Sequence, residues 1–337
     1  MGVLLLAAPA LAHAPRFAAD NASPATATVV ANADQSWAVY DRLGRAEVAY
    51  YRFTLEPGER LRVSTFTPVG GAFTPSVVLM SRAGGGGGGG SGAGGSGASG
   101  EGSSVPPGVV VPQGMTAEVV AGERPARPEL EPFTPMALFE TTSLDRPVTA
   151  ETTYLVAVYE PAGRPGPVGV AIGTTEAFTA TGYLGLPFDL VRVHRWAGQP
   201  WWLVLGPTAL TLIAGLGWAL SRRPEEANLP LVRGGLLAAG LLVLGSALGT
   251  ALQLGLALAR TGPTPLALVT LGYVATGLVA GWWVVWVARR VPLGLTWRSR
   301  VGLGLAAVAA LVVWAGFVVG PAAALVVAVT PNRWLEG

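Results

Sequence analysis

Four long apolar runs in the second half of the chain constrain its fold more than any other feature. They are Trp201–Leu220, Leu231–Ala259, Pro265–Ala288 and Val301–Val329. Each is long enough to form an α-helix that crosses the roughly 30 Å hydrocarbon core of a bilayer. Because no water satisfies backbone groups inside lipid, such runs form helices with internal hydrogen bonds. The sequence therefore predicts a bundle of four transmembrane helices.

The composition agrees with a membrane protein. Hydrophobic residues make up 51% of the 337 positions and charged residues 12%, which is about half the charge of an ordinary soluble domain. All basic residues except the histidines are arginines, and the chain has no cysteine. The missing cysteines exclude disulfide frameworks, thiol catalysis, iron–sulfur ligation and cysteine zinc sites. The arginines of the second half flank the apolar runs, so we expect a lipid bilayer and no nucleic acid as partner.

The arginines also predict the orientation in the membrane. Two of the connections between apolar runs are rich in arginine, and they contain Arg222, Arg223, Arg289, Arg290, Arg298 and Arg300. Positively charged loops stay in the cytoplasm, so these two connections are expected to be cytoplasmic. The residues before Trp201 and the C-terminus then lie outside, and we expect a multi-pass protein of the plasma or inner membrane.

The N-terminal segment reads as a signal peptide over residues 1–14. It is a short apolar run that ends in Ala12-His13-Ala14, a small-x-small pattern that signal peptidase recognises. We expect cleavage after Ala14, although the usual positive start of a signal peptide is missing. The alternative is an apolar tail that belongs to the mature fold.

Residues 24–180 have the two-residue periodicity of β-strands. Ala46–Leu55 and Leu61–Phe66 flank a Pro-Gly turn, and Thr153–Tyr159 and Val168–Ile172 flank a second turn, so each pair predicts a hairpin. Short strands separated by Gly/Pro turns favour a β-sandwich. The expected fold is therefore α+β: an extracytoplasmic all-β sandwich followed by the four-helix bundle.

A glycine-rich insertion at 84–104 interrupts the strands. Glycine occupies 13 of its 21 positions, and such a stretch loses much backbone entropy on folding without burying side chains. We expect a flexible surface loop. A phosphate-binding loop would need a Lys-Ser/Thr pair and a helix directly afterwards, which the sequence lacks.

The strand pattern resembles the pre-peptidase C-terminal (PPC) type of β-sandwich. The resemblance covers residues 45–173 and is carried by Tyr51–Val63, Ser76–Leu79, Tyr154–Tyr159 and Val168–Gly173. The long insertion and the missing protease domain depart from that pattern. The resemblance implies an extracytoplasmic binding or packing module, and it transfers no catalytic residue.

Residues 181–200 form the linker to the first apolar run. Leu186, Leu190 and Val193 have the spacing of one face of a short helix lying at the membrane interface; the alternative is a plain linker. His194 stands among Arg192, Arg195 and Trp196, and we expect a solvated interfacial residue rather than a metal ligand.

Tryptophans gather near the ends of the apolar runs. Those expected at the membrane interface are Trp196, Trp201, Trp202, Trp282, Trp283, Trp286 and Trp297, because tryptophan is enriched at the level of the lipid head groups. A quinone or pigment pocket stacked on tryptophans is the alternative, but the sequence shows no polar partner for such a ligand.

Small residues spaced four apart predict close helix packing. The pairs are Gly245/Gly249, Gly277/Gly281 and Gly316/Gly320, and Gln253 adds a polar group able to join helices by a hydrogen bond. The runs are otherwise almost free of ionisable groups, which disfavours proton relays and ion-coupled transport.

The sequence contains no recognisable catalytic, cofactor or metal motif. Carboxylates such as Asp41, Glu47, Glu140 and Glu176 have no matching partner in a known pattern. We therefore expect a non-catalytic accessory subunit that docks by its helices to a larger membrane complex and carries a β-sandwich on the outer face. The alternative is a membrane-anchored, receptor-like protein whose outer domain binds a ligand or polymer.

Overall fold

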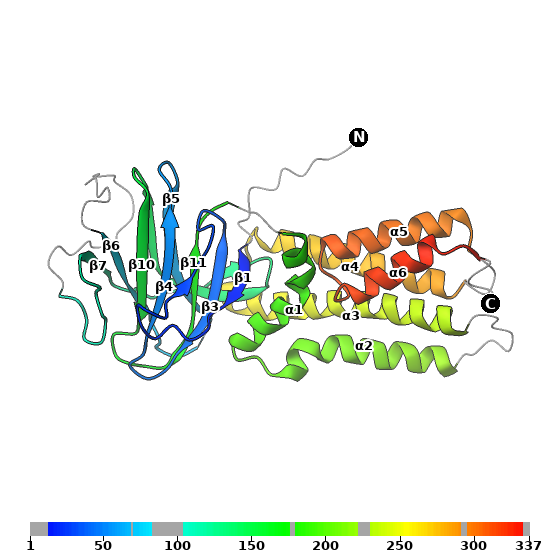
Figure 1. Ribbon diagram of the computed structural model, residues 1–337. Helices are drawn as coiled ribbons and strands as arrows, with labels where there is room; N and C mark the ends of the chain where they lie inside the picture. Colours follow the sequence, from blue (N-terminus) through cyan, green and yellow to red (C-terminus); the bar gives the residue numbers. More distant parts are fainter. Residues whose placement is uncertain are drawn as a thin grey trace. The chain divides into compact units, whose positions relative to one another are not determined.

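The computed structural model describes residues 13–68, 70–82, 104–175, 179–221, 230–290 and 295–332. These residues form two compact units. The first contains the β-strands up to Thr179, and the second contains the helices from Ala180 onward together with the short segment Leu130–Met136 (Figure 1). Residues 1–12 of the expected signal peptide, and all but the last residue of the glycine insertion, lie outside the described residues.

The described residues contain eleven strands, nearly all of them in the first unit. They are β1 (Ala14–Phe17), β2 (Thr28–Val29), β3 (Trp37–Leu43), β4 (Val48–Leu55), β5 (Arg60–Pro68), β6 (Ser76–Arg82), β7 (Met115–Val120), β8 (Glu129–Glu131), β9 (Met136–Pro147), β10 (Thr152–Tyr159) and β11 (Gly166–Ile172). One sheet has the order β1-β3-β11-β5-β9-β8, and the other has the order β2-β4-β10-β6-β7. Both sheets are mixed, because β1 runs parallel to β3 and β2 runs parallel to β4.

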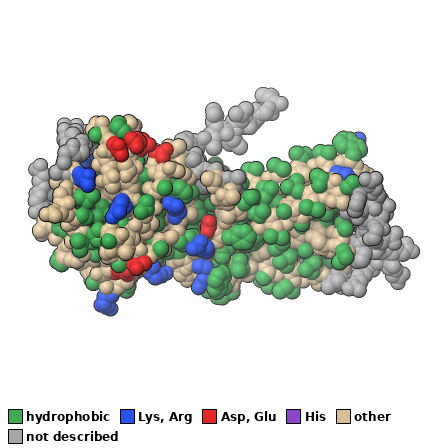
Figure 2. All heavy atoms as spheres, in the orientation of Figure 1, with side chains coloured by type: hydrophobic (Ala, Val, Ile, Leu, Met, Phe, Trp, Pro, Cys, Tyr) green, Lys and Arg blue, Asp and Glu red, His purple; other side chains and the backbone are tan. Residues whose placement is uncertain are grey.

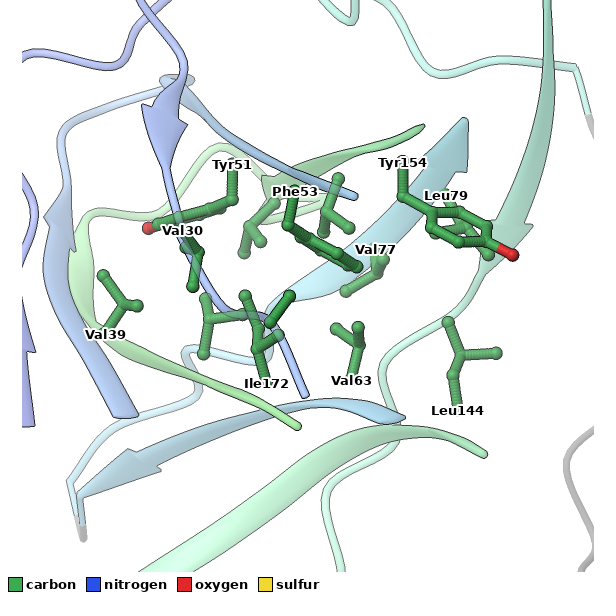
Figure 3. Close-up of a cluster of buried hydrophobic side chains, with 14 of the residues drawn as sticks. Val30, Val39, Tyr51, Phe53, Val63, Val77, Leu79, Leu144, Tyr154 and Ile172 are labelled. Atoms are coloured by element: carbon green, nitrogen blue, oxygen red, sulfur yellow. The ribbon is translucent and has the colours of Figure 1, made fainter. Parts of the chain in front are cut away.

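The inner faces of the two sheets form one hydrophobic core. Figure 3 shows Tyr51, Phe53 and Tyr154 of one sheet facing residues such as Val63 and Ile172 of the other. Burying side chains of this size is worth about 1.5–3 kcal/mol each. The alternation predicted from the sequence therefore corresponds to the inward positions of a two-layer β-structure.

The two hairpins expected from the sequence are wrong, although their strands form. β4 pairs with β10 and β2, whereas β5 pairs with β11 and β9 in the other sheet. β10 and β11 are likewise in different sheets. Each Pro-Gly turn thus joins the two sheets instead of two neighbouring strands. Residues 56–59 suffice for this, because packed sheets are about 10 Å apart and each extended residue spans about 3.3 Å.

The described residues of the second unit form six helices. They are α1 (Ala180–Trp196), α2 (Trp201–Ser221), α3 (Pro230–Thr261), α4 (Ala267–Ala288), α5 (Trp297–Val312) and α6 (Val319–Val329). Among the described residues, three helices, α2, α3 and α4, are long and apolar enough to cross a membrane. Apolar side chains dominate the visible surface of this unit, and charged ones gather on the β-sheet unit (Figure 2). α1 occupies the linker, where the sequence predicts a helix.

The fourth predicted span, Val301–Val329, is not one continuous helix. α5 ends at Val312 and α6 begins at Val319. Between them, Trp314, Phe317 and Val318 have φ angles of 55°, 54° and 63°, as does Gly316 at 88°. Such angles are rare outside glycine and are a clear outlier for β-branched valine. This stretch breaks the helical path although every residue in it is apolar.

α3 is the centre of the helical unit and packs against α2, α4 and α6. Its contact with α4 is close because glycines face each other: a Cβ on Gly281 would lie 2.8 Å from the backbone N of Leu244 and 3.0 Å from the carbonyl oxygen of Gly240. A Cβ on Gly245 would lie 2.7 Å from the Cα of Thr208 in α2. Helix backbones approach this closely only where side chains are absent.

Candidate binding site

A segment from the β-strand region takes part in the helical unit. Residues 130–136, which comprise the end of β8, the connection after it and the first residue of β9, cluster with the helices. The Thr270 hydroxyl of α4 donates a hydrogen bond to the carbonyl oxygen of Pro132 at 2.6 Å. Leu130 is buried in a cluster with Leu254 and Ala267. This segment, called the β8–β9 loop below, supplies one wall of a pocket.

Six parts of the helical unit contribute described residues to this pocket. Its lining includes Phe133 and Thr134 of the β8–β9 loop, Leu190 and His194 of α1, Val204 and Thr208 of α2, Ser246, Thr250 and Gln253 of α3, Tyr273 of α4, and Trp314 and Phe317 of the break between α5 and α6. The centre of a water molecule can occupy about 80 Å³ inside it. One water needs roughly 10–15 Å³ on this measure, so the pocket has room for several waters or for part of a small molecule.

His194 is the most informative side chain of the pocket. It is 7% exposed, and its Nδ1 atom is buried without a hydrogen-bond partner among the described residues. Burial lowers the pKa of this imidazole to about 4, so it is neutral at physiological pH. A neutral imidazole offers one donor and one acceptor. The solvated interfacial histidine expected from the sequence is therefore wrong, because α1 turns this residue inward.

Gln253 is buried in the same pocket and has a partner that the sequence did not reveal. Its side-chain amide donates to the Oε1 of Gln199 at 2.8 Å, and the Gln199 amide donates back to the Oε1 of Gln253 at 2.8 Å. Gln199 lies between α1 and α2, so this pair ties their junction to α3. Among the described lining residues, the Nδ1 of His194 and the Nε1 of Trp314 are then the buried side-chain atoms without a hydrogen-bond partner.

Three aromatic rings form part of the pocket wall. Phe133 and Tyr273 have ring centroids 6.0 Å apart, and Tyr273 and Trp314 have centroids 5.6 Å apart in an edge-to-face arrangement. Phe133 and Trp314 are 6.4 Å apart. These three rings join the β8–β9 loop, α4 and the strained break. Residues in strained conformations occur preferentially at functional sites.

The pocket is uncharged. None of the described residues that line it carries an ionised side chain. The nearest titratable group in the β8–β9 loop sequence is Glu131, where burial raises the pKa to about 7 and the backbone N–H of Phe133, donating at 3.2 Å, acts in the opposite direction. On α1, Asp189 and Arg192 form an exposed ion pair at 3.2 Å. The arrangement can bind a neutral polar group but offers no charge to neutralise an ion.

The other residues singled out in the sequence lie outside this pocket. Trp196 is buried, and Trp201, Trp202, Trp282 and Trp297 are exposed. Trp283 and Trp286 stack on each other at 4.9 Å.

The arginines next to the helices contact aromatic rings or polar groups. Arg289 stacks on Trp218 and Arg290 on Trp286. Arg300 donates to the Asn332 side chain at 2.5 Å, and Arg298 lies over Trp297. Arg222 and Arg223 lie outside the described residues.

The glycines expected at helix contacts differ in their surroundings. A Cβ on Gly277 would lie 2.9 Å from the Cβ of Ala247, one on Gly316 would lie 2.6 Å from Val243, and one on Gly320 would lie 2.9 Å from the carbonyl oxygen of Ala239. Gly249 lines the pocket, and its nearest neighbour would be Pro207 at 3.9 Å. It therefore makes room at the pocket instead of a tight backbone contact.

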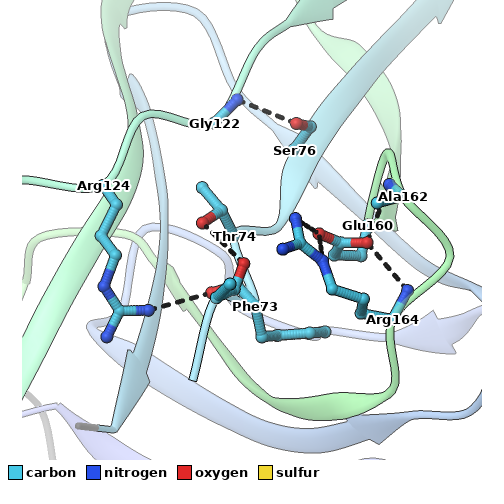
Figure 4. Close-up of polar contacts among 9 residues, drawn as sticks. Phe73, Thr74, Ser76, Gly122, Arg124, Glu160, Ala162 and Arg164 are labelled. Carbon is cyan, nitrogen blue, oxygen red and sulfur yellow. Dashed lines mark hydrogen bonds and ion pairs between the residues drawn. The ribbon is translucent and has the colours of Figure 1, made fainter. Parts of the chain in front are cut away.

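The β-sheet unit uses its polar groups for structure. Glu160 is buried, and its carboxylate accepts hydrogen bonds from the backbone of Ala162 and Arg164 at 2.8 Å and from the Arg164 guanidinium at 2.7 Å (Figure 4). Burial alone would raise the pKa of Glu160, but these hydrogen bonds outweigh it and lower the pKa. Asp41 accepts from the Tyr51 hydroxyl at 2.6 Å and from Asn21 at 3.0 Å. Both clusters hold loops and strands in place.

Among the described residues, no group of three or more His, Asp or Glu side chains could hold a metal ion. Glu47 accepts from the backbone N–H of Gly44 at 2.5 Å, and burial raises the pKa of Glu140. Glu176 lies outside the described residues.

Comparison with known proteins adds little to these observations. No protein-family model matches the sequence, and no curated protein matches it. One similar solved structure is PliG of Aeromonas hydrophila, a periplasmic lysozyme inhibitor of g-type lysozyme. It is 12% identical, the match covers 48% of this chain and 100% of that chain, and the TM-score is 0.22. A likeness of this size carries no argument about function, and the resemblance to the PPC sandwich stays a prediction.

Proposed function

We propose that this chain is a membrane-anchored binding protein. The observation that carries the proposal is the pocket around His194, where a buried Nδ1 has no partner among the described residues. Leaving a buried polar atom unpaired costs about 1–3 kcal/mol, and a ligand that forms this hydrogen bond recovers that cost. The ligand site belongs to the helical unit, and the β-sandwich is the outer domain of the same protein.

The membrane orientation is part of this proposal. α2, α3 and α4 cross the bilayer, the β-sandwich is extracytoplasmic, and Arg289 and Arg290 are cytoplasmic. The apolar composition of the three helices supports the crossing, and the placement of the arginines supports the direction. The pocket then lies in the outer half of the membrane.

The test compares the purified full-length chain with a variant whose pocket is filled. Gly249→Leu adds a side chain at the pocket wall, and Gly255→Leu adds the same side chain on α3 where no described atom lies within 4 Å of the added Cβ. Native mass spectrometry from lipid nanodiscs should show one small molecule bound to the parent chain and to Gly255→Leu. The same mass shift should be missing from Gly249→Leu. Equal spectra for all three proteins would contradict the proposal.

A second candidate is the accessory subunit of a larger membrane complex. It is favoured by α2, which packs against α3 and leaves large apolar side chains exposed, among them Trp202, Leu210 and Ile213. Lipid or a partner helix covers such a face equally well. A photoreactive amino acid at Ile213 distinguishes them: a discrete protein adduct in native membranes supports the subunit. Lipid adducts alone contradict it. Val279 on α4 is the comparison site, where only lipid adducts are expected.

A further inference from the structure

We propose that the pocket around His194 binds the ring of a lipid-soluble para-quinone or its quinol. This proposal rests on the binding function proposed above and names the class of ligand. Four independent features of the pocket limit the ligand: its charge, its hydrogen-bonding atom, its aromatic wall and its depth along the helices.

The first feature is the missing charge. The described lining residues are uncharged, and the imidazole of His194 is neutral because burial lowers its pKa to about 4. Transferring an unpaired ion into such surroundings is very costly. Phosphate and ammonium head groups of ordinary lipids are therefore poor ligands, whereas an uncharged quinone ring loses little on entering.

The second feature is the buried Nδ1 of His194, which has no partner among the described residues. Because neutral imidazole has one N–H donor and one acceptor nitrogen, it can serve both forms of the ligand. As a donor, the ring nitrogen binds the carbonyl oxygen of a quinone. As an acceptor, it binds the hydroxyl of a quinol. Gln253 is already bonded to Gln199. The Nε1 of Trp314 also has no partner among the described residues, but an indole N–H can only donate, so His194 is the anchor that serves both the quinone and the quinol.

The third feature is the aromatic wall of Phe133, Tyr273 and Trp314, whose centroids are 5.6–6.4 Å apart. A flat ring packs well against aromatic side chains in stacked or edge-to-face geometry. The space for water centres, about 80 Å³, exceeds by several fold the roughly 10–15 Å³ that one water needs. An apolar cavity of about 150 Å³ binds benzene, so this space takes the oxygen-bearing edge of a quinone ring and the pocket widens to admit the whole ring.

The fourth feature is depth. Thr208 follows the start of α2 by seven residues, which is about 10 Å at 1.5 Å per residue. Gln253 is bonded to Gln199, two residues before α2, so the pocket extends from the start of α2 to the level of Thr208. A ligand that reaches this depth from the bilayer must itself be lipid-soluble, as a quinone with an isoprenoid tail is. The lipid tail then stays among the apolar side chains outside the pocket.

The experiment uses the full-length chain in phosphatidylcholine nanodiscs, titrated with decylubiquinone or menaquinone-4 while tryptophan fluorescence is recorded. We expect saturable quenching with one site for at least one of the two probes, which also identifies the preferred ring. His194→Leu should weaken binding at least tenfold, and His194→Asn, which keeps a donor, should weaken it less. Decyl-tetramethoxybenzene, which lacks free carbonyl or hydroxyl groups, should not compete.

A second readout separates a direct contact from a structural role of His194. The carbonyl stretching band of the bound quinone should shift to lower wavenumber in the parent chain, since a hydrogen bond weakens the C=O bond, and not in His194→Leu. If His194→Leu does not fold, Thr250→Leu narrows the pocket from α3 and should abolish saturable quenching. Quenching that stays linear, or that is equal in all variants, overturns the quinone proposal.

The outcome also separates this inference from the binding function itself. If native mass spectrometry finds a pocket-dependent ligand that is not a quinone, the binding function stands and the quinone assignment fails. If Gly249→Leu and the parent chain carry the same molecules and neither probe saturates, both fail.

Discussion

Gln199 and Gln253 exchange two hydrogen bonds, each 2.8 Å long, and so connect the junction of α1 and α2 to α3. Each side chain thus donates one hydrogen bond and accepts one, and Gln253 is only 5% exposed. This pair fixes α1 against the longer helices and thereby holds His194 at the pocket.

Breaking this pair on one side should cost more than replacing both residues. Gln199→Leu leaves the buried amide of Gln253 without its partner, and we expect a loss of about 1–2 kcal/mol in the free energy of unfolding. In the double Leu variant, neither amide remains, so the loss should be smaller. SDS-induced unfolding followed by circular dichroism measures Gln199→Leu, Gln253→Leu and the double variant. If the loss of unfolding free energy in the double variant equals the sum of the two single losses, the two side chains are not coupled.

Glycine at the α3–α4 contact should not tolerate even a methyl group. Gly281→Ala puts a Cβ at 2.8 Å from the backbone N of Leu244, so the helices must move apart, at a cost of about 1–3 kcal/mol. Gly272→Ala on the same helix meets no described atom within 4 Å and should gain up to about 1 kcal/mol of helix stability. The same unfolding assay compares them, and equal effects would contradict the close packing.

The stability of the helical unit should fall in mild acid because of His194. Its pKa is about 4 in the fold against 6.5 in the unfolded chain. The depressed pKa contributes stability above about pH 6.5, and this contribution is lost as the pH falls toward 4 because the unfolded state takes up the proton first. The shift corresponds to about 3 kcal/mol.

Two variants isolate this effect. His194→Gln should remove the dependence between pH 6.5 and 4. Glu131 acts in the opposite direction, because its raised pKa of about 7 contributes stability at low pH that is lost as the pH rises from 4.5 through 7. The chain with His194 and the His194→Gln variant are therefore compared in a Glu131→Gln background. Unfolding midpoints that depend equally on pH with and without His194 would argue against a buried neutral imidazole.

In the β-sandwich, Tyr51 should be far more sensitive than Tyr154. Tyr51→Phe removes the hydroxyl that donates to Asp41 at 2.6 Å in a fully buried position, and should cost about 2 kcal/mol. The Tyr154 hydroxyl points away from the cluster in Figure 3, so Tyr154→Phe should change stability by less than about 0.5 kcal/mol. Hydrogen exchange of peptides from β4 and β10 in the full chain measures both changes. Equal protection in the two variants would exclude the stabilising role of the Asp41 contact.

The cysteine-free sequence allows a direct test of the proposed orientation. Ala162→Cys lies in an exposed turn of the β-sandwich, and Arg290→Cys lies just beyond α4. A membrane-impermeant maleimide should label the first variant in intact cells and the second only after the membrane is opened. The reverse pattern would invert the topology.

The sequence predicted the elements better than their connections. Hydropathy located α2, α3 and α4 because transfer into lipid depends on composition along one continuous segment. It missed the break at Trp314–Val318, since these residues are all apolar and hydropathy does not report backbone angles. Alternation located the strands but not their partners, because a period of two shows which face is buried and not which strand lies beside it.

The pocket was harder to predict because its walls come from distant parts of the chain. His194 stands next to Arg195 and near Arg192 in sequence, which suggested the membrane surface. Its helical neighbours at i−4 and i−7, Leu190 and Pro187, are apolar and line the pocket with it, and this spacing is the signal that was available. No local pattern indicated that Phe133 would join the helices from the β8–β9 loop.

The order of strands in the two sheets has a consequence for how the β-sheet unit folds. β10 lies between β4 and β6, and β11 lies between β3 and β5. Before these last two strands arrive, the earlier ones have no continuous sheet to join, and contacts between residues far apart in sequence form slowly. The domain therefore completes its fold only after residue 172 has emerged, immediately before α1 and the first membrane helix follow. Until then, the chain presents unpaired strand edges, which are prone to misassembly.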